Sequence, residues 1–347
     1  MNASVVELDA VESRAYHELR TDAVVVHRSA RMRMTFSGGK AKEALGGLLT
    51  NDVAALTPGQ GHRAVALTPK GRVIALVRVM ERGADVLVDA DAAAGPGFIA
   101  MIRKYVNPRL AKYVDITASS RCIGIYGPNS AAKLASALAS GADASGADAL
   151  TSLGDHGSLT IGTGDDAVFI VRSGDFGGDG FDCIAGADRI AALETALTAV
   201  GLSRADASVA TIARIEAGVP EWGVEMDDET IPQEANLDAL GAISFNKGCY
   251  TGQEVVARIH FRGHVNRHLR WLSADESLPV HANVFDAEGK EVGTVRSSVV
   301  SPVRGALAIA MVRREVEPGS EVLVRDNAHD NAHDNAREIR ARCDAIG

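Results

Sequence analysis

Residues 245–254 read Phe245-Asn-Lys-Gly-Cys-Tyr-Thr-Gly-Gln-Glu254. The two glycines on either side of Cys249 permit a tight backbone turn. From Gln253 onward the sequence predicts a helix, on which Glu254 and Arg258 are spaced to form an ion pair. A lone cysteine is usually an inert, small apolar residue. Here the glycine-flanked polar setting, the adjacent Lys247 and the nearby helix N-terminus favour a reactive thiolate instead.

Charge is distributed unevenly on the two sides of this segment. Residues 215–246 contain eight acids and no lysine or arginine, whereas residues 247–270 contain five bases and one acid. The acids are Glu216, Glu221, Glu225, Asp227, Asp228, Glu229, Glu234 and Asp238, and the bases are Lys247, Arg258, Arg262, Arg267 and Arg270. Two solvated faces opposite each other are the simpler interpretation of such runs.

Three histidines in the basic stretch have the spacing of a metal-binding helix face, namely His260, His264 and His268. Gly263 and Val265 interrupt that helix, so we expect no metal site there. A repeated Asn-Ala-His-Asp near the C-terminus, at Asn327 and Asn331, is interpreted as a duplicated surface turn.

Composition restricts the class of protein. The 347 residues are 46% hydrophobic and 23% charged, as in ordinary globular proteins of two or three domains. The net charge of −9 disfavours a general nucleic-acid or anionic-membrane binder. No apolar run approaches the roughly 18 residues that span a bilayer, and the N-terminus carries acids where a signal peptide is basic. We therefore expect a cytoplasmic protein without direct nucleic-acid or membrane contacts.

The cysteines also bear on the class of site. Cys122, Cys183, Cys249 and Cys343 lie far apart and form no Cys-x-x-Cys pair, so a disulfide framework is not expected. An iron–sulfur cluster usually takes four thiolates, so this chain alone is not expected to hold one stably. Cys343 is expected to lie in an exposed tail.

Local patterns predict a mixture of helices and strands. Residues 63–67 and 73–79 form one expected hairpin, and residues 166–171 and 181–184 form another around a glycine-rich turn. The N-terminal twenty residues are predicted to form a short strand and an amphipathic helix. Further helices are predicted at residues 130–139 and 187–200, with a loose loop over residues 140–149. Short alternating stretches after Leu269 predict a small antiparallel barrel.

Taken together, the ordered motifs resemble those of the YgfZ family, which is related to the folate-binding T-protein (aminomethyltransferase) of the glycine cleavage system. The segment Lys247-Gly-Cys-Tyr-Thr-Gly-Gln-Glu254 carries the resemblance most specifically. Weaker landmarks occur along this chain in the order that the family has them. They are Leu49-Thr-Asn-Asp-Val53, Leu67-Thr-Pro-Lys-Gly-Arg-Val73, Arg172-Ser-Gly-Asp-Phe-Gly-Gly-Asp-Gly-Phe181, Arg214-Ile-Glu-Ala-Gly218, Ile231-Pro-Gln-Glu234 and Glu291-Val-Gly-Thr294. The resemblance implies an α+β folate-binding module of two intertwined subdomains over residues 1–268, and a small β-barrel over residues 269–347.

The resemblance also implies a set of site residues. Glu216 is the expected acceptor for the pterin edge of tetrahydrofolate, because a carboxylate accepts two parallel N–H donors. The further expected cofactor contacts are Tyr250, Gln253, Arg258 and Arg262, the arginines attracting the anionic glutamate tail. Cys249 and Lys247 are the expected catalytic pair. Relatives that transfer an aminomethyl group carry an aspartate at the position of Ala75, with Leu76 next; neither residue can exchange a proton.

The function implied is a tetrahydrofolate-binding accessory protein for assembly or repair of iron–sulfur clusters in client enzymes. The expected partners are those clients, including enzymes that modify tRNA, or cluster carrier proteins. A tetrahydrofolate-dependent aminomethyl or methyl transferase or demethylase stays open as the alternative, as does a structural module with an incidental cysteine.

Overall fold

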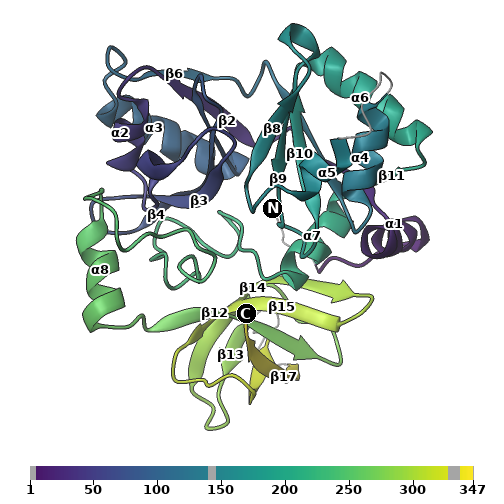
Figure 1. Cartoon of the computed structure of the whole chain (residues 1–347). Helices are drawn as coiled ribbons and strands as arrows, with labels where there is room; N and C mark the ends of the chain where they lie inside the picture. The colour runs from purple at the N-terminus through teal and green to yellow at the C-terminus, as the bar shows by residue number, and fades with distance from the viewer. Residues whose placement is uncertain (1–4, 140–145, 327–336, 347) are drawn as a thin grey trace.

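The computed structural model describes residues 5–139, 146–326 and 337–346. Two α/β lobes lie side by side, and a β-barrel lies below both of them (Figure 1). The described helices include none that is long and apolar enough to cross a membrane.

The first lobe is built on a five-stranded antiparallel sheet with the strand order β3-β4-β5-β2-β6. Its strands are β2 (Met32–Ser37), β3 (Gly61–Leu67), β4 (Val73–Glu81), β5 (Val86–Ala90) and β6 (Lys112–Asp115). Its helices are α2 (Ala41–Gly46), η1 (Val53–Ala55), η2 (Ala92–Ala94) and α3 (Gly95–Tyr105). The predicted first hairpin is confirmed, because β3 and β4 pair in antiparallel register.

The second lobe has a six-stranded sheet with the order β11-β1-β7-β10-β9-β8. Its strands are β1 (Val24–His27), β7 (Arg121–Tyr126), β8 (Ser158–Ile161), β9 (Val168–Arg172), β10 (Gly180–Ala185) and β11 (Ser203–Ala205). Its helices are α1 (Ala10–Thr21), α4 (Ser130–Leu138), α5 (Gly146–Thr151), η3 (Gly164–Asp166) and α6 (Ala187–Ala199). The second hairpin, β9–β10, is confirmed, as are the helices predicted at residues 130–139 and 187–200.

Two local predictions differ from the structure in this lobe. The loose loop predicted over residues 140–149 is wrong for residues 146–149, which belong to α5, because alanine and leucine favour a helix there. Residues 140–145 lie outside the described residues. At the N-terminus the helix α1 is present, capped by Asp9, but in place of a strand there is a single bridge between Val6 and Val299.

The two lobes are intertwined along the chain. The chain forms α1 and β1 in the second lobe, crosses to the first lobe for β2 to β6, and returns to the second lobe at β7. Because side chains alternate along a strand, each sheet presents one face to its own helices and the other to the opposite lobe. Met80 and Leu87 of the first sheet pack against Phe169 and Val171 of the second at this junction. The junction between the lobes is therefore a buried part of the fold.

The C-terminal residues form a closed antiparallel barrel with the order β12-β15-β14-β13-β16-β17. Its strands are β12 (Arg267–Ala274), β13 (Asn283–Phe285), β14 (Glu291–Ser301), β15 (Gly305–Arg313), β16 (Ser320–Arg325) and β17 (Glu338–Ala345). The predicted α+β module followed by a barrel is thus confirmed, while its division at residues 268 and 269 stays a prediction. The Asn-Ala-His-Asp repeat lies outside the described residues.

Helix α7 (Ala207–Glu216) joins the barrel to the lobes. Its residues Val209, Ile212 and Ile215 share one apolar cluster with Leu307 and Ile309 of the barrel. After α7 a long irregular segment runs between the lobes and the barrel to α8 (Gln253–Arg262) at the edge of the molecule (Figure 1). This segment contains both the acidic stretch and the cysteine motif.

Candidate functional site

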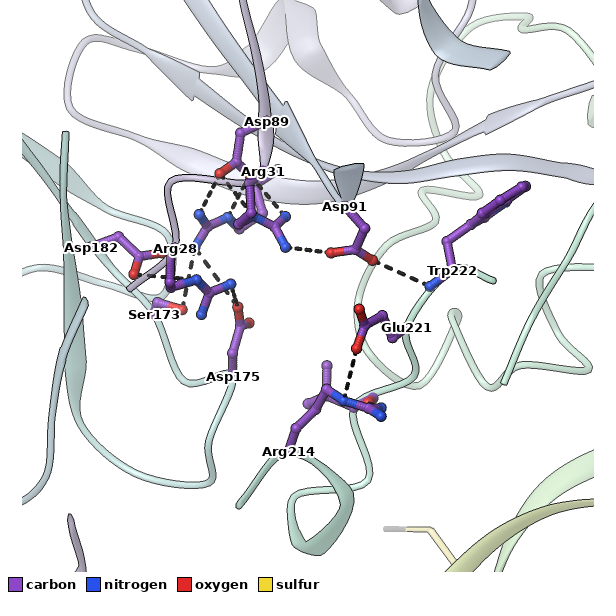
Figure 2. Close-up of polar contacts among 12 residues, drawn as sticks. Arg28, Arg31, Asp89, Asp91, Ser173, Asp175, Asp182, Arg214, Glu221 and Trp222 are labelled. Atoms are coloured by element: carbon purple, nitrogen blue, oxygen red, sulfur yellow. Dashed lines mark hydrogen bonds and ion pairs between the residues drawn. The ribbon is translucent and has the colours of Figure 1, made fainter. Parts of the chain in front are cut away.

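A cavity of about 390 Å³ lies where the two lobes meet α7 and the segment that follows it. Figure 2 shows polar side chains around it, from Arg28 and Asp175 on one side to Asp91 and Glu221 on the other. The charged residues that line it are Arg28, Arg31, Arg63, Arg78, Arg204 and Arg214 with Asp91, Asp175, Asp206 and Glu221. Six arginines against four carboxylates give the wall an excess of positive charge.

Strand β4 supplies part of this wall through its alternating side chains. Leu76, Val77 and Arg78 line the cavity, whereas Ala75 and Val79 lie in the core between the first sheet and its helices, to which Val77 also contributes. The residue that faces the cavity is therefore Leu76 rather than Ala75. Neither position carries a carboxylate, so β4 offers the cavity no group that exchanges protons.

A buried ion-pair network forms the inner wall and connects the two lobes. Arg78 donates to Asp89 in its own sheet at 2.7 Å and to Asp182 in the opposite sheet at 2.5 Å. Arg63 donates to Asp175 across the same junction at 2.8 Å, and Arg28 donates to the other oxygen of Asp175 at 2.7 Å. The predicted glycine-rich hairpin turn thus carries Asp175 into the wall.

Electrostatics in this network favour the charged forms. Burial by itself would raise the pKa of Asp175, but the guanidinium groups of Arg28 and Arg63 outweigh it and hold that pKa well below its ordinary value. Asp89 is likewise buried, and Arg31 and Arg78 lower its pKa. The carboxylates of Asp89 and Asp175 are therefore ionised at neutral pH.

Of the two carboxylates on the opposite wall, Asp91 has a partner for each oxygen and Glu221 is less completely paired. Glu221 lies 3.3 Å from Nε of Arg214, whose two terminal nitrogens donate to Glu225 at 3.0 Å. Within the described part of the chain, Oε1 of Glu221 has no hydrogen-bond partner. Burial raises the pKa of Glu221, and the nearby Asp91 adds to this while Arg214 opposes it. Asp91 itself accepts from Arg31 at 2.5 Å and from the Trp222 backbone at 3.3 Å.

The sequence did not single out Glu221 or Asp91. Glu221 was one of eight acids in the acidic run, and nothing in their spacing separated it from the others. Asp91 directly follows β5. A carboxylate at the end of a strand was the one sequence feature that could have marked Asp91 as a candidate site residue.

Glu216, the predicted pterin ligand, is placed differently. It ends α7, and its carboxylate accepts a hydrogen bond from Tyr16 at 2.8 Å and further hydrogen bonds from Arg20 and Ser301. It is not among the described residues that line the cavity. Its carboxylate therefore joins α1, α7 and the barrel, and this placement does not support a role as the ligand.

The cysteine motif forms a second, separate structural unit. Its backbone is held against residues 46–51, which include part of the Leu49-Thr-Asn-Asp landmark. Thr251 donates to the Gly47 carbonyl at 3.0 Å, and Thr50 donates to the Ala242 carbonyl at 2.6 Å. Two motifs that lie about 200 positions apart in the chain are thus one unit in space.

Lys247 strengthens this unit. Its ammonium donates to the carbonyl oxygens of Gly46, Leu49 and Asn51 at 2.5, 2.7 and 3.1 Å. Burial lowers the pKa of Lys247 to about 8, partly offset by the charge of Asp52. These three hydrogen bonds indicate that Lys247 holds the turn in place.

A third motif packs against the start of α8. Gly252 adopts a φ of +82°, and a Cβ atom there would lie 2.7 Å from the Thr68 carbonyl. Gly71 has a φ of +73°, and a Cβ atom there would lie 2.8 Å from Cβ of Val255. Both positions therefore require glycine, and the turn between β3 and β4 fixes where α8 begins.

The other predicted site residues lie on the cysteine turn and on α8 rather than around the cavity. Cys249 is exposed, whereas Cys122, Cys183 and Cys343 are buried. Burial raises the pKa of Tyr250 to about 12, and Gln253 is the first residue of α8. Arg258 and Arg262 lie exposed on α8. None of the seven predicted site residues is among the described residues that line the cavity.

Two further expectations can be compared with the structure. The predicted ion pair between Glu254 and Arg258 is absent from the described residues. His260 lies on α8, His264 in the following loop and His268 on β12, so the helical spacing does not persist. Within residues 5–139, 146–326 and 337–346, no three His, Cys, Asp or Glu side chains are grouped to hold a metal ion.

Comparisons with known proteins agree with this architecture. The family model of the GCVT N-terminal domain matches residues 7–247, and that of the CAF17 C-terminal beta-barrel domain matches residues 266–328. An aminomethyltransferase of Rubrobacter xylanophilus is 29% identical over 317 residues, covering 90% of this chain and 82% of that protein. The tRNA-modifying protein YgfZ of Escherichia coli (strain K12 / DH10B) is 40% identical over 121 residues, covering 33% of this chain and 37% of YgfZ.

A solved structure has the same fold over nearly the whole chain. Glycine cleavage system aminomethyltransferase T from Bartonella henselae superposes with a TM-score of 0.84 at 21% sequence identity. The superposition covers 99% of this chain and 91% of that one.

Proposed function

Since the chain belongs to the GCVT family and is of the YgfZ/CAF17 type, with a CAF17-type barrel after the GCVT domain, we propose that it is a tetrahydrofolate-binding accessory protein. Its role is the assembly or repair of iron–sulfur clusters in client enzymes in the cytoplasm. The clients include enzymes that modify tRNA, as the name of the YgfZ relative suggests. Cluster carrier proteins are the other class of partner.

The exposed Cys249 is the observation that carries this proposal. Its turn is held by backbone hydrogen bonds to residues 46–51, by the three carbonyl contacts of Lys247, and by close packing of Gly252. A thiol on a rigid, exposed turn is accessible to a cluster carried by another protein. Because one thiolate does not hold a cluster alone, the partner supplies the other ligands.

The cavity supports binding of the folate. Its volume of about 390 Å³ lies within the range of small-molecule sites. We propose that the free oxygen of Glu221, with Asp91 beside it, accepts the N–H donors of the pterin edge. Leu76 and Pro220 supply apolar wall, and Arg204 at the rim attracts the anionic tail. Bound tetrahydrofolate would supply a one-carbon carrier.

A transferase is the second candidate function. In its favour, the Rubrobacter aminomethyltransferase matches 90% of the chain, and Glu221 is a carboxyl group with a raised pKa in the cavity. Against it, Leu76 occupies the cavity-facing position of β4. We favour the accessory role because, where aminomethyltransferases carry an aspartate, this chain has Ala75 with Leu76 next to it, and neither side chain can exchange a proton.

The test compares cluster-enzyme activities in cells that lack the protein and express variants of it. Wild type should restore activity, and Cys249→Ser should fold but fail to restore it. Full restoration by Cys249→Ser would remove the thiol from the mechanism. Isothermal calorimetry with tetrahydrofolate tests the cavity separately, and no measurable binding would remove folate from the proposal.

A further inference from the structure

Helix α8 is poorly covered by the rest of the chain. Of its ten residues, Val256 is the one that is fully buried. The helix is attached through Gln233, which donates to the Val256 carbonyl at 2.9 Å, and through the contact of Val255 with Gly71. Most helices in proteins are stabilised by burying an apolar face. A helix that leaves half of its side chains exposed and buries one of them fully has surface available for a partner.

Aromatic side chains gather at the C-terminal end of this helix. Phe261 is 66% exposed, which is unusual for so large an apolar residue. The ring of Phe245 stacks on His260 with centroids 3.6 Å apart, and Phe261 meets the edge of that pair at 4.7 Å from His260. Phe245 belongs to the segment that leads to Cys249, so the turn runs from this aromatic cluster back to the start of α8.

The same helix is basic in an acidic protein. Arg258 and Arg262 are exposed, and among the described residues neither forms a hydrogen bond or an ion pair. Glu254 is the one acid on α8, while the whole chain has a net charge of −9. Unpaired arginines beside exposed aromatic rings are the composition typical of energetically important interface residues.

We propose that α8 and the Cys249 turn form one docking surface for a partner protein that presents acidic side chains around an apolar one. The apolar side chain packs on the exposed ring of Phe261, and the acidic groups pair with Arg258 and Arg262. A stable interface covers about 800 Å² per partner, which is enough to include both the aromatic cluster and Cys249. This inference rests on the proposed function, because it identifies the chemistry of the partner that reaches Cys249.

Two other occupants are less compatible with these contacts. A single-stranded nucleic acid would stack its bases on open aromatic faces, but Phe245 and His260 already cover each other. A second copy of this chain also has a net charge of −9, so the two copies repel each other overall. No feature of the described residues directs a second copy to α8.

The test uses the full chain in cells that lack the native protein. The photo-reactive amino acid p-benzoylphenylalanine replaces Phe261 in one variant and Tyr105 of α3 in a control, since Tyr105 is also an exposed aromatic residue on a helix. Molecules crosslinked at position 261 are identified by mass spectrometry, and the protein found is purified. Its affinity for the full chain is then measured by calorimetry at low and high salt.

Phe261→Ser and the double variant Arg258→Glu/Arg262→Glu should each weaken that affinity at least tenfold, and wild-type binding should weaken with salt. The matched controls, Tyr105→Ser and Arg103→Glu/Lys104→Glu on α3, should bind as wild type does. All four variants should keep the wild-type melting temperature, and Phe261→Ser should also keep the wild-type tetrahydrofolate affinity and Cys249 alkylation rate. The α8 variants should also fail to restore cluster-enzyme activity in cells.

Several outcomes overturn the inference. They are crosslinking to RNA, crosslinking to a second copy of the chain, no crosslink specific to position 261, or equal affinity of the α8 and α3 variants. If Cys249→Ser fails to restore activity while the α8 variants restore it, the docking surface is wrong and the proposed function stands. If Cys249→Ser restores activity fully, the proposed function is wrong instead.

Discussion

Alkylation of the four cysteines with iodoacetamide should distinguish Cys249 sharply from the others. The thiolate is the reacting form, so the rate depends on accessibility and on the thiolate fraction. Cys122, Cys183 and Cys343 are all 0% exposed. The expectation that Cys343 lies in an exposed tail is wrong, because β17 turns its side chain into the barrel core.

The burial of the three other cysteines determines how much more slowly they should be alkylated than an exposed thiol. Burial raises the pKa of Cys343 to about 11 and that of Cys122 to about 12. At pH 7.5 this reduces the thiolate fraction of Cys343 about 300-fold relative to an ordinary exposed thiol of pKa about 8.5. The greater nucleophilicity of a more basic thiolate restores about tenfold of that loss. Cys343 should therefore react at least about 30-fold more slowly than an ordinary exposed thiol, and Cys122 more slowly still.

A short labelling pulse at pH 7.5, followed by peptide mass spectrometry, measures these rates. Half-complete labelling of Cys249 should coincide with less than about 3% labelling of each buried cysteine. In urea all four should label at comparable rates, which shows that the fold causes the difference. If Cys249 in the folded protein labels no faster than Cys122, the turn is not accessible and the thiol-based mechanism is refuted.

Four further predictions concern the cavity and the turn. Glu221→Gln should weaken tetrahydrofolate binding by about 1.5–3 kcal/mol, the range for a hydrogen bond to a charged group, whereas Glu216→Gln should leave calorimetric affinity unchanged and lower the melting temperature. Arg78→Met removes the buried guanidinium that bridges Asp89 and Asp182 and should lower the free energy of unfolding by about 3–5 kcal/mol in urea titrations. The lowered pKa values of Asp89 and Asp175 mean that the stability contributed by these two carboxylates is present above about pH 4 and is lost as the pH falls below that value. An acid titration of stability as steep in Arg78→Met as in wild type would contradict the network's role. Lys247→Met removes three hydrogen bonds to carbonyl oxygens and should cost about 1–3 kcal/mol of unfolding free energy, with Cys249 still labelled faster than Cys122. Aminomethyl transfer with a lipoyl carrier protein should be absent, because neither Ala75 nor the cavity-facing Leu76 of β4 can exchange a proton and a general acid or base is worth about 10²–10⁴-fold in rate; turnover at the level of a glycine-cleavage enzyme would favour the transferase.

Local patterns in the sequence were sufficient for several helices and strands and for recognising the fold. The β3–β4 and β9–β10 hairpins follow from apolar runs separated by turn residues, and α4 and α6 follow from helical periodicity. The cysteine motif likewise predicted the start of α8 at Gln253. These features depend on neighbours within a few positions, so the order of the residues determines them.

The partners of individual charges were decided by the tertiary structure alone. Lys247 was expected to assist Cys249, yet its hydrogen bonds go to carbonyl oxygens of residues about 200 positions away. Glu216 was expected in the ligand site, but Tyr16 and Arg20 of α1 occupy its carboxylate. Glu221 was one acid among eight and became the candidate ligand because the chain path after α7 leaves one of its oxygens without a partner.

The sequence does not reveal these partners because the residues that contact each other lie far apart along the chain. Arg63 and Asp175 are separated by 112 positions and meet because two sheets pack face to face. The alternation of side chains along a strand predicts which residues share a face, and on β4 it puts Ala75 and Leu76 on opposite faces of the sheet. Which of the two faces meets a cavity depends on how the lobes, α7 and the barrel close around it, and that arrangement exists only in the folded chain.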